Sequence, residues 1–370
     1  MDGGRATAPI EAVGVDVFTI PTDTPESDGT LAWDATTMVL VRVRAAGREG
    51  LGYSYADTAT AILVRDKLAP LVAGRDAWSI NDRWLDMVRA IRNLGRPGIC
   101  SMGISAVDTA LWDLKAKLLG VALVDLLGAA RDSITAYGSG GFTSYSLERL
   151  REQLGGWARV GLTAVKMKVG RDATADIQRV GAAREAIGPG VRLFVDANGA
   201  YTREQALEQA RRFAEEDVRW FEEPVSSDDL EGLRLLRDTR PGGMAIAAGE
   251  YGYDLPYFRR MMAAGAVDAI QADATRCGGV TGFMDAAALA DAFGLPLSSH
   301  CAPALHVALC CAARRAVHLE YFHDHVRIER MFFDGAPQPR DGRLQPDRGR
   351  PGLGLELREQ DARRFRVPVA

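Results

Sequence analysis

The pattern of hydrophobic and polar positions changes character at about residue 130 of the chain. Over residues 10–55 apolar side chains alternate with polar ones, and a polar stretch from Pro21 to Thr30 interrupts the alternation. Alternation with a period of two predicts strands, so we expect an antiparallel pair joined by a long loop at its tip. Over residues 59–127 the apolar spacing becomes helical, and Gly120 ends the clearest helix. Strands followed by helices predict an α+β first domain.

After residue 131, short apolar runs alternate with amphipathic helical segments, and the pattern repeats about once every 25 residues. This is the length of a βα unit, and many such units in series predict a parallel barrel. The last thirty residues are rich in glycine and proline. They fit a strand that returns to the rest of the fold, or a covering segment, better than another βα unit. The seven apolar runs are 165–169, 193–195, 218–221, 245–248, 269–272, 297–299 and 317–319.

Each of these runs ends in a side chain that can bind a metal or move a proton. In a barrel of parallel strands the carboxyl ends open onto one face, so these side chains are expected to converge on one cavity. A single acid at a strand end has a simpler explanation, because such acids also cap the next helix or pair with an arginine. The shared position of all seven favours a common site. They are Lys168, Asp196, Glu222, Glu250, Asp273, His300 and Glu320.

Three of the acids, Asp196, Glu222 and Glu250, offer a set of oxygen ligands that suits Mg²⁺, or Mn²⁺. Because side chains alternate along a strand, only one of Glu222 and Glu223 is expected to point inward. We assign Glu222 as the ligand and leave Glu223 to a supporting or rim position. A divalent cation would neutralise the enediolate charge that forms when a proton is removed beside a carboxylate.

Lys166 and Lys168 project from the same face of one strand. Two neighbouring ammonium groups that are partly desolvated and near a metal should each have a lowered pKa, which would make one of them a base near neutral pH. The alternative is a solvated surface pair. The apolar strand argues against it, and so does the scarcity of lysine, which supplies five of the 45 basic residues.

Asp273 and His300 end consecutive runs, so the carboxylate is expected to orient the imidazole. Taken alone, His300 fits a hydrogen-bonded core histidine equally well, and that is our interpretation of His306. Glu320 is expected near the substrate carboxylate, as a hydrogen-bond donor if it is protonated. Cys277 and Cys301 lie beside proposed site residues in the sequence, but no arrangement of nucleophile, base and orienting group includes them. We interpret both as residues that only fill space in the core.

Composition narrows the class of protein. The chain has 370 residues, 47% of them hydrophobic, which is enough for two domains. Its formal charge of -4 leaves no basic stripe for nucleic acid. No apolar stretch is long enough for a membrane helix, and no signal peptide is visible. Five cysteines without metal-site spacing predict reduced thiols and a cytoplasmic protein.

The order Lys-x-Lys, Asp, Glu, Glu, Asp, His, with these spacings, resembles the enolase superfamily and specifically its mandelate racemase subgroup. The helical segment SAVDTALWDLKAKLLG and the tail PGLGLEL also resemble that family's structural segments. The resemblance implies an α/β fold, a modified TIM barrel (β/α)7β with an amino-terminal α+β capping domain. We place the capping domain at 1–130, the barrel at 131–340, and a segment that returns to the cap at 341–370. It also favours a homo-oligomer.

The resemblance also implies a role for each residue at the strand ends. Lys168 would be the base on one face of the α-carbon, and His300 with Asp273 would act on the other face. Lys166 would help to neutralise the substrate carboxylate, and Glu320 would assist there. Mg²⁺ would be held by the three acids named above.

These roles predict abstraction of the α-proton from a hydroxy-carboxylate, most simply as dehydration of an acid sugar to a 2-keto-3-deoxy acid by a carbon–oxygen lyase. A racemase, an epimerase or a lactone cycloisomerase would use the same residues. A non-catalytic binding protein would be expected to have lost a ligand or a base, and none is lost. The loops implied to recognise the substrate, 21–33 and 53–55, contain no arginine, which favours a monocarboxylate unless a barrel residue such as Arg276 supplies the charge.

Overall fold

Three long antiparallel strands form the first layer of the fold in a computed structural model, which describes residues 7–369. They are β1 (Ala12–Ser27), β2 (Ala32–Ala45) and β3 (Arg48–Tyr55). The prediction of a long loop over 21–30 is mostly wrong, because β1 continues to Ser27 and only four residues separate it from β2. A register shift between Pro21 and Glu26 accommodates this proline-containing stretch without ending the strand.

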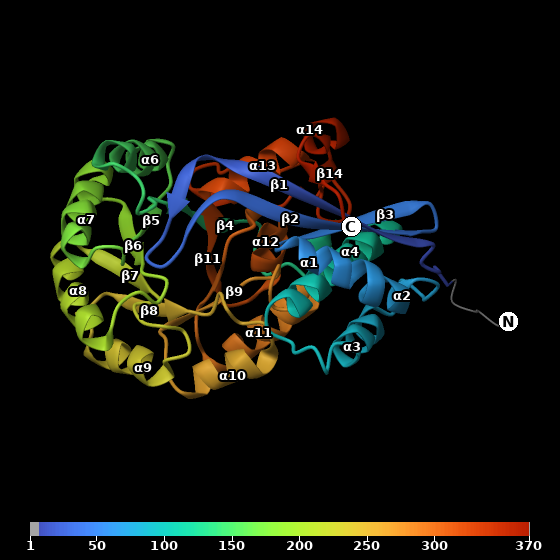
Figure 1. The fold of residues 1–370 in the computed structure, drawn as a ribbon, viewed down its shortest axis with the longest axis horizontal. Helices are drawn as coiled ribbons and strands as arrows, with labels where there is room; N and C mark the ends of the chain where they lie inside the picture. The colour runs from blue at the N-terminus through green and yellow to red at the C-terminus, as the bar shows by residue number, and fades with distance from the viewer. Residues whose placement is uncertain (1–6, 370) are drawn as a thin grey trace.

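Helices cover one side of this sheet (Figure 1). The longest, α4, ends at the predicted place, because Gly120 adopts the left-handed conformation with φ 70°. It lies close against β3, where a Cβ at Gly50 or Gly52 would collide with backbone atoms of α4. The helices are α1 (Thr58–Leu63), the π-helical turn η1 (Val64–Leu68), α2 (Ala69–Val72), α3 (Ile80–Ala90), α4 (Ile99–Leu119) and α5 (Leu123–Leu127).

Eight parallel strands form a closed barrel, because β11 pairs with β4 as well as with β10. The predicted α/β barrel with a capping domain is therefore confirmed. The strands are β4 (Ile134–Gly140), β5 (Ala164–Lys168), β6 (Arg192–Asp196), β7 (Val218–Glu222), β8 (Ala245–Ala248), β9 (Ala269–Ala272), β10 (Leu297–Ser299) and β11 (Ala316–Phe322). The hydrophobic pattern did not predict β4, whose second half is Tyr-Gly-Ser-Gly rather than an apolar run.

Seven helices alternate with these strands and form the outer ring seen on the left of Figure 1. This gives the (β/α)7β order. None of the helices in residues 7–369 is long and apolar enough to cross a membrane. The ring consists of α6 (Leu147–Arg159), α7 (Ala173–Ile187), α8 (Arg203–Glu215), α9 (Leu230–Thr239), α10 (Leu255–Ala263), α11 (Gly279–Phe293) and α12 (Pro303–Ala312).

The carboxyl-terminal segment contacts both parts of the molecule. One of its short strands pairs with β4 of the barrel, and another pairs with β1 of the cap. Its elements are β13 (Arg343–Leu344), β14 (Glu356–Leu357), α14 (Glu359–Arg363) and β15 (Arg366–Val367), and between β11 and this segment lie α13 (His323–Phe332) and β12 (Phe333–Asp334).

Direct hydrogen bonds also hold the cap against the barrel. Ser105 Oγ on α4 accepts hydrogen bonds from the backbone N–H groups of Gly278 and Gly279 at the start of α11. At the tip of the β1–β2 hairpin, the backbone carbonyl of Ser27 accepts a hydrogen bond of 2.8 Å from Thr143 N, in the loop after β4. The hairpin tip is therefore fixed beside the carboxyl ends of the barrel strands.

Candidate active site

The seven predicted strand-end residues do meet at one end of the barrel. Lys168, Asp196 and Glu222 are the last residues of β5, β6 and β7, and the others lie within β11 or just after β8, β9 and β10. Every one of the seven is buried, with at most 6% of its surface exposed. The convergence expected from the sequence is therefore present in the fold.

Three carboxylates form the centre of this group. Oxygen atoms of Asp196, Glu222 and Glu250 all lie within 4.8 Å of one another. Glu250 Oε2 is buried and has no hydrogen-bond partner among the described residues. Burying three carboxylates together is costly unless cations compensate their charge. The arrangement fits a hard divalent cation, because it offers several carboxylate oxygens and one of them is unpartnered.

The argument that only one of Glu222 and Glu223 can be directed inward is wrong. Glu223 is also buried, at 1% exposure, and its Oε1 has no hydrogen-bond partner among the described residues. The backbone at Glu223 leaves the strand conformation, with φ 37°, so the alternation of side chains ends at Glu222. Burial and the nearby carboxylates of Glu250 and Asp196 raise the pKa of Glu223 well above its usual value.

The two lysines are held by these same acids. Lys166 Nζ lies 2.6 Å from Glu222 Oε1 and 2.8 Å from Glu320 Oε1, and Lys168 Nζ lies 2.5 Å from Asp196 Oδ2. Burial alone would lower the pKa of Lys168, but the charges of Asp196, Glu250 and Glu222 together outweigh burial and the neighbouring Lys166, so the pKa of Lys168 is raised. The pKa of Lys166 is raised for the same reason, chiefly by Glu222. Among the protein's own groups, carboxylates rather than the second ammonium group dominate each lysine's surroundings. The lowered lysine pKa values expected from the sequence assume a metal beside them and stay a prediction.

Asp273 and His300 form the expected pair. His300 Nδ1 lies 2.8 Å from Asp273 Oδ2, and the other oxygen of Asp273 accepts hydrogen bonds from the backbone N–H and hydroxyl of Thr275. Burial opposes the charged imidazolium, yet Glu250 and Asp273 raise the pKa of His300 above its usual value. His306 bonds to backbone groups through both ring nitrogens, which agrees with its interpretation as a core residue.

Glu320 is present in the group, but not as the protonated donor considered from the sequence. Burial alone would raise the pKa of Glu320, but the charges of Lys166 and His300 outweigh it and hold this pKa below its usual value. Its oxygens accept hydrogen bonds from Ser139 Oγ and from the backbone N–H of Cys301. Glu320 is thus an ionised partner of Lys166.

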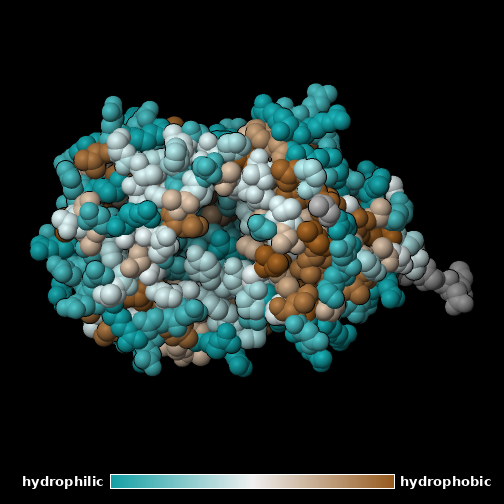
Figure 2. All heavy atoms as spheres, viewed as in Figure 1, coloured by the Kyte–Doolittle hydropathy of each residue, from teal (hydrophilic) through white to brown (hydrophobic). Residues whose placement is uncertain are grey.

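Three residues of this group, Lys168, Glu250 and His300, line a cavity of about 420 Å³. On the molecular surface it corresponds to the hollow between the barrel ring and the capping helices, at the centre of Figure 2. We call its barrel side the cavity floor, which includes Lys168, Asn198, Glu250, Arg276, His300 and Cys301. We call its cap side the cavity roof, which includes Asp28, Leu31, Trp33, Thr36, Tyr55 and Asp57.

The sequence reasoning missed two floor residues. Asn198 lies two residues after Asp196, and its Oδ1 is buried without a partner among the described residues. Its place in the FVDAN segment was the available signal. Cys301 was interpreted as a residue that only fills space in the core, yet it lines the cavity, and its Sγ lies 3.2 Å from His300 Nε2. Its position directly after His300 was the corresponding signal.

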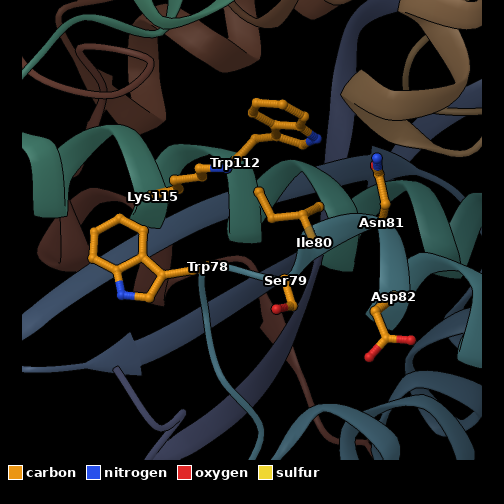
Figure 3. A pocket seen from close by; sticks show the side chains of 7 residues that line it. All are labelled: Trp78, Ser79, Ile80, Asn81, Asp82, Trp112 and Lys115. Atoms are coloured by element: carbon orange, nitrogen blue, oxygen red, sulfur yellow. The ribbon is translucent and has the colours of Figure 1, made fainter. Parts of the chain in front are cut away.

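A second cavity, of about 330 Å³, lies in the cap between the start of α3 and α4 (Figure 3). Its walls include Trp78, Trp112 and Lys115, and all of its lining residues come from positions 78–115. It contains none of the strand-end groups. The cavity lined by Lys168, Glu250 and His300 is therefore the candidate active site.

Two family models together match most of the chain. Residues 149–362 match the family described as enolase C-terminal domain-like. Residues 14–128 match the mandelate racemase / muconate lactonizing enzyme N-terminal domain. These spans cover the barrel from β5 onward and most of the antiparallel sheet with its helices.

Three known proteins illustrate the likeness. A solved structure of a mandelate racemase/muconate lactonizing enzyme-like protein from Rubrobacter xylanophilus has a TM-score of 0.95 and 55% identity over 97% of this chain and 100% of that one. The L-talarate/galactarate dehydratase of Salmonella typhimurium is 33% identical over 96% of this chain and 90% of its own length. A solved structure of an L-talarate/galactarate dehydratase mutant liganded with Mg and L-glucarate has a TM-score of 0.91 and 30% identity over 100% of this chain and 95% of that one. The 3,6-anhydro-alpha-L-galactonate cycloisomerase of Streptomyces coelicolor is 35% identical over 94% and 97%.

Proposed function

The chain belongs to the mandelate racemase / muconate lactonizing enzyme family, and on this premise we propose that it is a Mg²⁺-dependent lyase that dehydrates an acid sugar to a 2-keto-3-deoxy acid. The observation that carries the proposal is that Lys168, Glu250 and His300 line one cavity, with Asp273 hydrogen-bonded to His300 and with Glu250 belonging to the group of three buried carboxylates. Relatives named as dehydratases of acid sugars support the same reaction class.

Asp196, Glu222 and Glu250 are proposed to hold the Mg²⁺, with Glu223 directly beside them. When bound, the cation stabilises the negative charge that builds on the substrate carboxylate as the neighbouring carbon loses its proton. Lys166, fixed between Glu222 and Glu320, contributes a positive charge on the same side of the cavity.

Lys168 and His300 are proposed to move the protons. They extend from the non-neighbouring strands β5 and β10, so they approach the cavity from different sides. One of them takes the proton from the α-carbon, and the protonated imidazole of His300 donates a proton to the departing 3-hydroxyl group. Asp273 holds the imidazole through Nδ1, so that Nε2 is the nitrogen turned to the substrate side.

An isomerase is the second candidate, favoured by the same two-sided placement. Lys168 and His300 on opposite faces of one carbon would support racemisation or epimerisation, and opening of an internal ether or lactone in place of a hydroxyl group would give a cycloisomerase. The cycloisomerase relative supports this alternative. The outcome depends on whether the bound acid offers a leaving group to His300.

The test is incubation of the protein with Mg²⁺ and a panel of acid sugars in deuterated water, followed by NMR. A 2-keto product supports dehydration, and deuterium at C2 without a keto group supports the isomerase. If no acid of a panel covering each stereochemical series exchanges its α-proton, the proposed function is wrong.

A further inference from the structure

The positive charges at the cavity are already matched by protein carboxylates. Among the described residues that line it, the lysine and arginine side chains are Lys168 and Arg276. Lys168 is paired with Asp196, as described above. Arg276 Nη1 lies 3.3 Å from Glu250 Oε1, and its Nε lies 3.8 Å from Asp273 Oδ2. Arg276 is therefore not a spare cation for a substrate.

The position of Arg276 is also fixed by packing. Its guanidinium lies 5.3 Å from the ring centroid of Tyr251, and Nη1 additionally donates a hydrogen bond to the backbone carbonyl of Glu250. Turning this side chain toward a ligand would break its contacts with the buried carboxylates of Glu250 and Asp273, whose charges it balances. The sequence left open that Arg276 might bind a second substrate carboxylate, and these contacts argue against it.

The roof is acidic. Asp28 and Asp57 both line it, and their hydrogen bonds come from groups of their own turns: Leu31 N donates to Asp28 Oδ1, and Ala59 N donates to Asp57 Oδ1. Neutral N–H groups do not cancel the charge of a carboxylate. The roof therefore presents negative charge to whatever part of the substrate lies away from the floor.

A substrate with one carboxylate suits this distribution. Its carboxylate would lie at the floor, near Lys166, Lys168 and the proposed cation, and its far end would face Asp28 and Asp57. Hydroxyl groups at that end can donate hydrogen bonds to these acceptors. A second carboxylate there would meet the like charges of Asp28, which is buried, and Asp57, which is exposed. Among the described residues that line the cavity, no unpaired lysine or arginine offsets these charges.

We infer that the cavity selects acid sugars that carry a single carboxylate and an uncharged, hydroxyl-bearing far end, and that Asp28 and Asp57 exclude the corresponding diacids. The inference rests on the proposed function and adds to it the chemical class of the substrate. It assigns Asp28 and Asp57 as residues that determine specificity rather than the chemical step.

The experiment compares matched pairs of substrates. Each pair consists of a six-carbon aldonate and the aldarate of the same stereochemical series, for example galactonate and galactarate, so that only the far carbon differs. With Mg²⁺-loaded enzyme, the kcat/KM for formation of the keto product or for α-proton exchange is expected to be about 100-fold higher for the monoacid of the accepted series.

Two variants test the assigned residues. The double variant Asp28→Asn/Asp57→Asn keeps side-chain oxygens that can accept the hydrogen bonds of both turns but removes both charges. It is expected to lower the monoacid-to-diacid ratio at least about tenfold, by raising kcat/KM for the diacid. The matched control is Asp34→Asn, an exposed acid on the same hairpin outside the cavity lining, which should leave the ratio unchanged.

The outcomes separate the two proposals. If neither monoacids nor diacids exchange their α-proton, the proposed function fails. If the enzyme turns over the diacid as well as the matched monoacid, or if the double variant keeps the wild-type ratio, the function stands and the inference on specificity is wrong. A ratio that falls equally in Asp34→Asn would also overturn it, because a general change in surface charge would then explain the effect.

Discussion

The cavity floor and the cavity roof hold their polar groups by different means. At and beneath the floor, Lys166 bridges Glu222 and Glu320, and Lys168 pairs with Asp196. The buried charges therefore depend on one another across several strands. On the roof, Asp28 and Asp57 are held by local turns within a few residues of themselves. The floor is therefore a coupled network in which one substitution affects several groups, whereas a roof substitution should have local effects.

This difference implies a division of labour. Groups that move protons and bind a cation need fixed positions, which the strand ends provide. Groups that recognise the variable part of a substrate are better placed on a hairpin tip and a short strand-to-helix connection, where sequence can change without disturbing the barrel. Substitutions on the floor should therefore reduce the chemical step, and substitutions on the roof should change binding or selectivity.

The largest effect is expected for Lys168→Ala. Removal of the proposed base should lower kcat by about 10³-fold or more and abolish the exchange of the α-proton on one face of the carbon. Stereospecific deuterium incorporation followed by NMR measures this. Lys67→Ala, which removes an exposed lysine of the cap, is the control. Exchange by Lys168→Ala at the wild-type rate would contradict the assigned role and the division between floor and roof.

The next effect concerns the two neighbouring glutamates. Glu222→Gln removes a carboxylate of the three-acid group, so Mg²⁺ should no longer raise the Tm as it does in the wild type, and activity should be lost. Glu223→Gln is expected to be milder, about a 10- to 100-fold loss of activity with part of the Mg²⁺-dependent rise in Tm retained. Thermal unfolding with and without Mg²⁺ checks both variants. Equal effects would refute the choice of Glu222 over Glu223 as the ligand, which strand alternation no longer supports.

The acids and lysines at the floor also show how far the sequence predicts the site. Asp196 and Glu222 were predictable because a parallel barrel brings all strand ends to one face once the repeating pattern is recognised. The position of Glu223 was not, because the backbone leaves the strand at that residue, and no hydrophobic pattern encodes a single positive φ. The effect of the protein's carboxylates on the lysine pKa values was not predictable either, because it depends on which carboxylate lies 2.5 Å away, a distance set by packing between strands.

The roof was less predictable than the floor. Its shape follows from a strand that continues past two prolines to Ser27, where the polar composition indicated a loop. Its contact with the barrel, Ser27 to Thr143, joins residues that are far apart in sequence and carry no shared motif. The acidity of the roof was visible in the sequence, but which acids line the cavity depends on how the hairpin packs.

A smaller effect is expected for a roof substitution, Trp33→Leu. Trp33 lines the cavity and packs edge-to-face on Phe142, with ring centroids 5.6 Å apart, and Leu would remove part of this wall. We expect KM to rise about tenfold while kcat changes by less than about threefold, because the floor is not altered. Steady-state kinetics on the best substrate gives this split. A fall in kcat as large as that of Lys168→Ala would show that the roof takes part in the chemical step and would remove the proposed division.

The smallest effect is on stability and concerns Glu26, which lies behind the roof. Burial and the nearby Asp324 raise the pKa of Glu26 to about 8, although a hydrogen bond from Trp33 Nε1 opposes the shift. A carboxyl group whose pKa is raised in the folded state contributes stability that is fully present below its unfolded pKa and is lost as the pH rises through the folded value. The wild type should therefore lose stability from this group between pH 5 and about pH 8.

Glu26→Gln isolates this contribution, because glutamine stays neutral over the whole range. The variant and the wild type should have similar free energies of unfolding at about pH 5, and at about pH 9 the variant should be more stable by about 1–3 kcal/mol. Urea unfolding at the two pH values measures the difference, with the exposed Glu49→Gln as control. If Glu26→Gln loses as much stability with rising pH as the wild type, the carboxyl group is not held neutral by burial. The hairpin would then have to compensate a charge at Glu26, and the roof would resemble the floor more closely than its local contacts indicate.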